Sequence, residues 1–189
     1  MSDPCRFDRR ALLKAGIGAG FGLTLTSRSG AQGDPASIRP REGDLLVRLA
    51  DTARTPLTPA DIPLGTAQTM AWAMDPADRI VRSGARFNQL LLVRFEPEKL
   101  SVETRSRAAD GVLAYTAICT HAGCDVDDWL PDEHLLSCSC HASMFDPRDG
   151  ARVVDGPAPR GLPALPLKVV EGKLVVAGPF TARVGFETG

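Results

Sequence analysis

The sequence contains few aromatic residues and little net charge. Aromatic side chains make up 5% of its 189 residues, and there is a single tyrosine. Basic and acidic residues nearly cancel, leaving a net charge of −1, which argues against a nucleic-acid-binding surface. No apolar run reaches the ~20 residues of an ordinary transmembrane helix. The 43% of hydrophobic residues is enough for one domain with a modest core.

The first 31 residues have the composition of an export signal. A basic region ending at Lys14 precedes a weakly apolar, glycine-rich stretch from Ala15 to Thr26. The pair Arg9-Arg10 resembles the start of a twin-arginine signal. The alternative, a glycine-interrupted helix, is disfavoured by four alternating glycines. We expect cleavage near Ala31 and a periplasmic product, with membrane tethering only if the signal stays attached.

Short apolar runs separated by proline and glycine follow, and they predict an all-β fold. Residues 32–43 are polar and are expected to form a linker or arm, and the proline-rich residues 51–78 are expected to be irregular. No amphipathic helix is evident. The prediction for residues 44–189 is a small antiparallel β-sandwich or barrel. The expected strands cover residues 44–49, 89–95, 112–118 and 135–138, with a hairpin formed by 168–170 and 173–176.

Four of the five cysteines gather in two short segments. The first is Cys119-Thr120-His121-Ala122-Gly123-Cys124, and the second is Cys138-Ser139-Cys140-His141-Ala142-Ser143. Each offers a cysteine and a histidine at short spacing, together with one extra cysteine. Such residues bind zinc or an iron–sulfur cluster. Two plain disulfides are a further alternative, but they leave both histidines unexplained.

The pattern resembles the Rieske iron–sulfur proteins of the respiratory type. The resemblance implies a [2Fe–2S] cluster with one iron on Cys119 and Cys138 and the other on His121 and His141. It also implies a disulfide between Cys124 and Cys140 and a cluster-binding subdomain over about residues 117–160. Because two thiolates are replaced by neutral imidazoles, such clusters have potentials of about −150 to +300 mV, above those of all-cysteine plant-type clusters.

Two further features, Ser143 and a proline loop, match that family in register, and a zinc site would need neither of them, nor Cys124 and Cys140. Ser143 matches a serine whose hydroxyl bonds a cluster sulfur. Phe145 stands where quinol-oxidising relatives usually have a tyrosine that bonds a ligand sulfur. One donor is therefore missing, and we expect a potential below the top of the range. The sequence Gly156-Pro157-Ala158-Pro159 resembles the proline loop that covers the cluster.

The resemblance implies an electron-transfer subunit without a substrate site of its own. It would pass electrons between a larger catalytic oxidoreductase subunit and a cytochrome-type acceptor. Phe145 and the lack of a clear anchor favour a protein similar to the small subunit of arsenite oxidase. The proline loop favours the alternative, the Rieske subunit of a quinol:cytochrome c oxidoreductase. A ring-hydroxylating oxygenase is excluded because its mononuclear iron needs two more histidines, and only His134 remains.

The remaining polar residues near these segments predict ordinary surface positions. His134 follows an acidic pair and is expected to be solvated. Asp125, Asp127 and Asp128 form an acidic run that we interpret as a solvated face, with docking of a basic cytochrome as a weaker alternative. Tyr115 is expected in the core.

Overall fold

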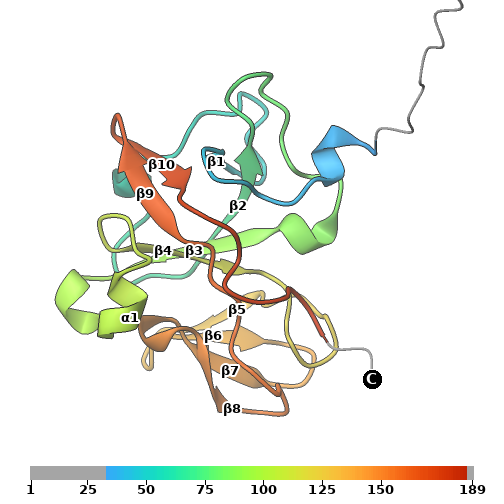
Figure 1. Cartoon of the computed structure of the whole chain (residues 1–189). Coiled ribbons are helices and arrows are strands. Elements are labelled where there is room, and N and C mark those ends of the chain that lie inside the picture. Colours follow the sequence, from blue (N-terminus) through green and yellow to red (C-terminus); the bar gives the residue numbers. More distant parts are fainter. Residues whose placement is uncertain (1–32, 187–189) are drawn as a thin grey trace, which may run out of the picture. The chain divides into compact units, whose positions relative to one another are not determined.

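A computed structural model of the chain describes residues 33–186, and these residues form an antiparallel β fold (Figure 1). The predicted signal segment, residues 1–31, lies outside the described residues. The one α-helix of the described part, α1, is a single turn, Val102–Arg105. The strands are β1 Leu45–Arg48, β2 Thr69–Met74, β3 Leu90–Arg94, β4 Val112–Thr116, β5 Asp128–Leu130, β6 Leu135–Cys138, β7 Ser143–Asp146, β8 Arg152–Asp155, β9 Leu167–Val170 and β10 Lys173–Val176.

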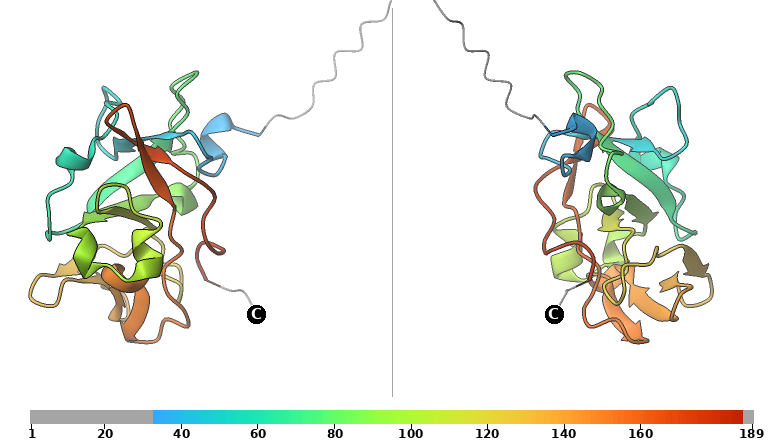
Figure 2. Two further views of the ribbon diagram at one scale, coloured as in Figure 1. Left: turned by 60° about the vertical axis from the view of Figure 1, so that its left-hand side comes forward. Right: turned by 90° about the vertical axis from the view of Figure 1, so that its right-hand side faces the viewer.

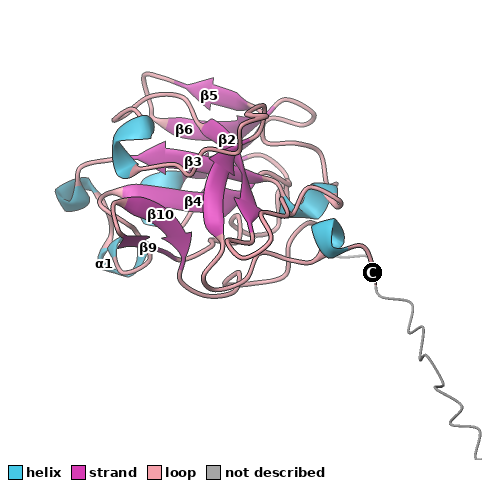
Figure 3. Ribbon diagram, turned by 90° about the horizontal axis from the view of Figure 1, so that it is seen from above, coloured by secondary structure: helices cyan, strands magenta, loops and turns pink. Residues whose placement is uncertain are grey.

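A six-stranded sheet with the order β4-β3-β2-β1-β10-β9 carries most of the core. Its strand β3 is buried on both faces, with Leu90, Leu91 and Leu92 fully inaccessible to solvent. A continuous apolar run is what such a doubly covered strand requires. Figure 3 shows how strands dominate the fold and how helices are confined to short turns.

A four-stranded sheet with the order β5-β6-β7-β8 forms the smaller subdomain, inserted between β4 and β9. Both views of Figure 2 place its hairpins beyond one end of the larger sheet. The two sheets share one apolar cluster, in which Phe95 and Tyr115 meet Leu136 and Phe145. The prediction of an all-β antiparallel fold is confirmed, and Tyr115 is buried as expected.

The expectation of an irregular stretch over residues 51–78 is wrong in its second half. Strand β2 lies there and pairs with both β1 and β3. The prolines stand outside it, since Pro63 precedes the strand and Pro76 follows it. The three strands β5, β7 and β8 were also missed, because each has only three or four residues and includes at least one charged residue.

The residues just before β1, expected to form a linker or arm, are hydrogen-bonded to the domain. The Arg82 guanidinium donates to the Pro35 carbonyl, and the Asn88 amide donates to the Ile38 carbonyl over 2.8 Å. Arg82 is 3% exposed and forms an ion pair with the equally buried Asp44. Within residues 33–186, no helix has the length and apolar character needed to cross a membrane.

Candidate metal centre

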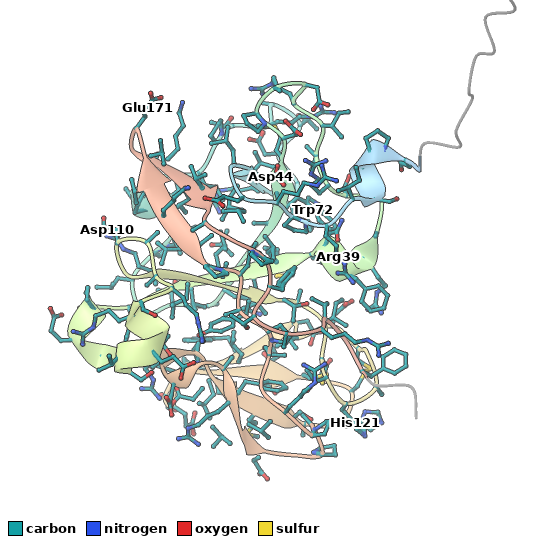
Figure 4. The ribbon with its side chains drawn as sticks, in the orientation of Figure 1. Arg39, Asp44, Trp72, Asp110, His121 and Glu171 are labelled. Atoms are coloured by element: carbon teal, nitrogen blue, oxygen red, sulfur yellow. A yellow bond between two sulfur atoms is a disulfide. The ribbon has the colours of Figure 1, made fainter. Side chains whose placement is uncertain are left out.

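The structure brings the two cysteine- and histidine-containing segments together. The first follows β4, and the second forms the turn between β6 and β7. A disulfide joins Cys124 to Cys140, with the Cα atoms 6.5 Å apart. The rings of His121 and His141 meet edge to face, with centroids 4.7 Å apart. His121, labelled in Figure 4, lies at the tip of the smaller subdomain.

The two remaining cysteines of the segments are buried and free. Cys119 and Cys138 are each 1% exposed. Burial raises the pKa of the Cys138 thiol, and its neighbour Cys119 raises it further, while the backbone N–H groups of Cys140 and His141 lower it. Two such thiols side by side become thiolates when a cation replaces their protons. The pair is therefore suited to one metal ion.

The two histidines are also suited to binding a metal ion. The Nδ1 atom of His121 is buried, and among the described residues it has no hydrogen-bond partner. An unpaired buried nitrogen is costly unless a ligand completes it. His141 is exposed and His121 is half-buried, so the imidazole side of the centre faces solvent and the thiol side faces the core.

The spread of these groups fits a binuclear cluster better than a single zinc ion. In a tetrahedral zinc site, ligand atoms lie about 3.3–3.8 Å apart. Within the part of the chain that the structure describes, no three of the four predicted ligands have atoms all within 4.8 Å of one another. The group that does is Cys124, Cys138 and Cys140, and two of its sulfurs are used by the disulfide. The predicted ligands instead form two pairs, as a [2Fe–2S] cluster requires.

The segment Gly156-Pro157-Ala158-Pro159 packs against the second ligand segment. The Ala158 amide donates a hydrogen bond to the fully buried Ser143 hydroxyl over 3.2 Å. Gly156 has φ +88°, and a Cβ there would lie 2.5 Å from the Ser143 Cα. Only glycine allows this approach. The predicted proline loop and Ser143 are thus held together, while Phe145 is fully buried in the core.

Several residues around the centre carry no recognisable sequence signal. The Thr120 hydroxyl, between two predicted ligands, donates to the Arg160 carbonyl over 2.6 Å. The Arg86 guanidinium donates to the Gly123 carbonyl and also pairs with Asp125. These contacts join segments far apart in the chain, and arginine side chains at a surface are too common for their partners to be predicted.

His134 lies outside the centre, and its surroundings are less polar than the sequence predicts. It is half-buried, and its ring stacks near Phe95 and Trp129 at centroid distances of 6.1 and 6.0 Å. Its Nδ1 lies 2.7 Å from the Pro131 carbonyl oxygen. The acidic pair before it suggested a polar loop, but the turn folds back onto apolar side chains.

Known proteins resemble the chain across this region. The family model for the Rieske [2Fe-2S] domain matches residues 84–166. The cytochrome bc1 complex Rieske iron-sulfur subunit of Streptomyces lividans is 34% identical over 147 residues, which is 76% of this chain and 85% of that protein. A protein of Haloferax mediterranei named as a respiratory nitrate reductase Rieske subunit is 44% identical over 107 residues, 55% of this chain and 47% of its own length. The crystal structure of the plasma membrane Rieske protein PetC3 from Synechocystis PCC 6803 is 23% identical, with a TM-score of 0.40, and the match covers 63% of this chain and 93% of that one.

Proposed function

The chain belongs to the Rieske iron–sulfur protein family, and we propose that it is an exported electron-transfer subunit serving a larger oxidoreductase. Its cofactor is a [2Fe–2S] cluster, which supplies reversible one-electron transfer when bound. The observation that carries the proposal is the pairing of buried Cys119 and Cys138 with His121 and His141 at a solvent-facing tip.

Each residue of the centre has a separate task in this proposal. Cys119 and Cys138 would hold one iron of the cluster, and His121 and His141 would hold the other. The Cys124–Cys140 disulfide fixes the two ligand segments to each other. Because His141 is exposed, its ring would be the point at which an electron donor or acceptor approaches the cluster.

The relatives support a respiratory role, since one is named as a subunit of a cytochrome bc1 complex and another as a subunit of a nitrate reductase. For this chain we propose service to a periplasmic catalytic subunit, similar to the arrangement in arsenite oxidase, with a cytochrome-type acceptor. Phe145 supports this choice: it cannot donate a hydrogen bond, so the cluster lacks one interaction that raises the potential. The twin-arginine pattern supports export of the folded protein.

A redox titration of the purified protein, followed by electron paramagnetic resonance, tests the proposal. We expect a signal that appears on reduction, with a midpoint potential inside about −150 to +300 mV. The variant His141→Cys adds a thiolate to the outer iron and should lower that potential sharply. His134→Cys is the matched control and should leave it unchanged. Absence of iron, or an unchanged potential in His141→Cys, would contradict the ligand assignment.

A second candidate is the Rieske subunit of a quinol:cytochrome c oxidoreductase. The 34% identity to the Streptomyces lividans subunit and the proline loop packed on Ser143 favour it. A potential near the upper end of the family range, falling as the pH rises, would support this candidate. A clearly lower potential would support the accessory subunit, as would co-purification of the native chain with a catalytic subunit that lacks a quinol site.

A further inference from the structure

The C-terminal strap, residues 181–186, runs from the larger sheet to the first ligand segment. In Figure 1 the red segment after β10 passes down to the smaller subdomain, and both views of Figure 2 show the same course. Its upper end is fixed by two hydrogen bonds: the Thr181 amide donates to the Ala164 carbonyl, and the Ala164 amide donates to the Thr181 hydroxyl.

Arg160 fixes the middle of the strap. Its Nη2 atom donates two hydrogen bonds, to the Arg183 carbonyl over 2.8 Å and to the Gly185 carbonyl over 2.7 Å. The backbone carbonyl of the same residue accepts a hydrogen bond from the hydroxyl of Thr120, which lies between Cys119 and His121. Arg160 therefore connects the strap, the end of the proline loop and the first ligand segment.

The far end of the strap packs directly on that segment. Gly123 is buried with φ +75°, and a Cβ built there would lie 2.7 Å from Cδ1 of the Phe186 ring. On its other side, the Gly123 carbonyl accepts a hydrogen bond from Arg86 over 2.7 Å. The turn that precedes Cys124 is thus contacted by both an aromatic ring and a guanidinium.

We infer that the strap positions the first ligand segment. Arg160 holds the strap through its hydrogen bonds, and Phe186 contacts Gly123. This inference rests on the proposed function, because it assumes that Cys119 and His121 hold the cluster. The disulfide ties the two ligand segments only to each other. The strap ties the first of them to the larger sheet, so it limits the opening through which the cluster would be lost.

The test compares Phe186→Ala and Arg160→Ala with the parent holoprotein. We expect both variants to lose the visible absorbance of the cluster several-fold faster in the presence of a chelator, and to show altered g-values and a shifted midpoint potential. Arg183→Ala is the matched control: it removes the same charge but keeps the carbonyl that Arg160 contacts, and should behave as the parent does. Variants with the parent's rate of cluster loss, g-values and potential would overturn the inference.

A double-mutant cycle tests the contact between Phe186 and Gly123 itself. Gly123→Ala alone should accelerate cluster loss because its methyl group meets the ring. Adding Phe186→Ala to Gly123→Ala should slow the loss of the cluster again in part, so the two effects on its rate are not additive. Additive effects would overturn the contact as the cause. If Gly123→Ala does not fold, the comparison of Phe186→Leu with Phe186→Ala still tests whether a large side chain at position 186 slows cluster loss. A parent protein without a cluster would instead refute the proposed function.

Discussion

The backbone amide of Ala158 donates to the hydroxyl oxygen of Ser143, and both residues are buried beside the centre. A hydroxyl has one proton to donate and two lone pairs to accept with. Since the amide occupies a lone pair, the Ser143 proton remains available for a cluster sulfur. The hydrogen bond from the proline loop thus leaves the Ser143 hydroxyl proton free to be donated elsewhere.

We predict that Ser143→Ala lowers the midpoint potential. The hydroxyl bond to a sulfur is stronger in the more negative, reduced cluster, so its loss favours the oxidised form. A loss of roughly 1–2 kcal/mol corresponds to a decrease of roughly 40–85 mV for one electron. The measurement is the redox titration, with Ser106→Ala as control because the exposed Ser106 hydroxyl donates to the Glu103 carbonyl beside α1. A potential equal to the parent's would show that Ser143 does not contact the cluster.

The opposite shift is expected for Phe145→Tyr. Phe145 pairs with Leu136 across the smaller sheet and is fully buried. A hydroxyl added there restores the donor of the quinol-oxidising relatives and should raise the potential by a similar amount. Phe95→Tyr is the control, because Phe95 is another buried aromatic residue of the same apolar core. Lower stability in Phe145→Tyr with no change in potential would mean that its hydroxyl is left unpaired, and would contradict the prediction.

Sequence patterns identified most strands that carry apolar runs, but they missed β2, whose apolar residues lie in a proline-rich stretch, and the short strands β5, β7 and β8. The run before Cys119 predicted β4, and the turn Glu171-Gly172 predicted the β9–β10 hairpin, where both residues adopt positive φ as a tight hairpin requires. Strand β8 was missed because most of its residues are exposed. The burial of a strand depends on its partners, which a local pattern does not contain.

Some residues of the candidate site could likewise be predicted from the sequence, and others could not. Ligand residues are rare and closely spaced, so the cysteine and histidine pattern could be recognised from the sequence alone. The contacts of Arg86 and Arg160 join positions up to 40 residues apart, and nothing in the local sequence of either arginine indicates them. Such contacts follow from the fold, and their prediction requires the coordinates.

We predict that Cys124→Ser makes the cluster labile without removing it from freshly prepared protein. The disulfide closes a loop of 16 residues, and its loss should cost about 3 kcal/mol of unfolding free energy. The measurement is the rate at which the visible absorbance decays in air and with a chelator. The double variant Cys124→Ala and Cys140→Ala removes both sulfurs of the disulfide, so no new thiol is created, and it should decay equally fast. A decay rate equal to the parent's would show that the disulfide does not clamp the segments.

Arg82→Ala separates global stability from the properties of the cluster. Arg82 forms ion pairs with Asp44 and Asp75, and its hydrogen bond with Asp44 raises its pKa. Removing it leaves the Asp44 charge buried and unpaired, which should lower the unfolding free energy by about 3–5 kcal/mol. The exposed ion pair between Lys168 and Glu42 is the control. Lys168→Ala should lower the unfolding free energy by less than about 1 kcal/mol. Denaturant unfolding measures both effects. The potential of Arg82→Ala should equal the parent's, because the pair holds residues 35–44 and not the ligand segments. A shifted potential would show that this end of the larger sheet is coupled to the centre.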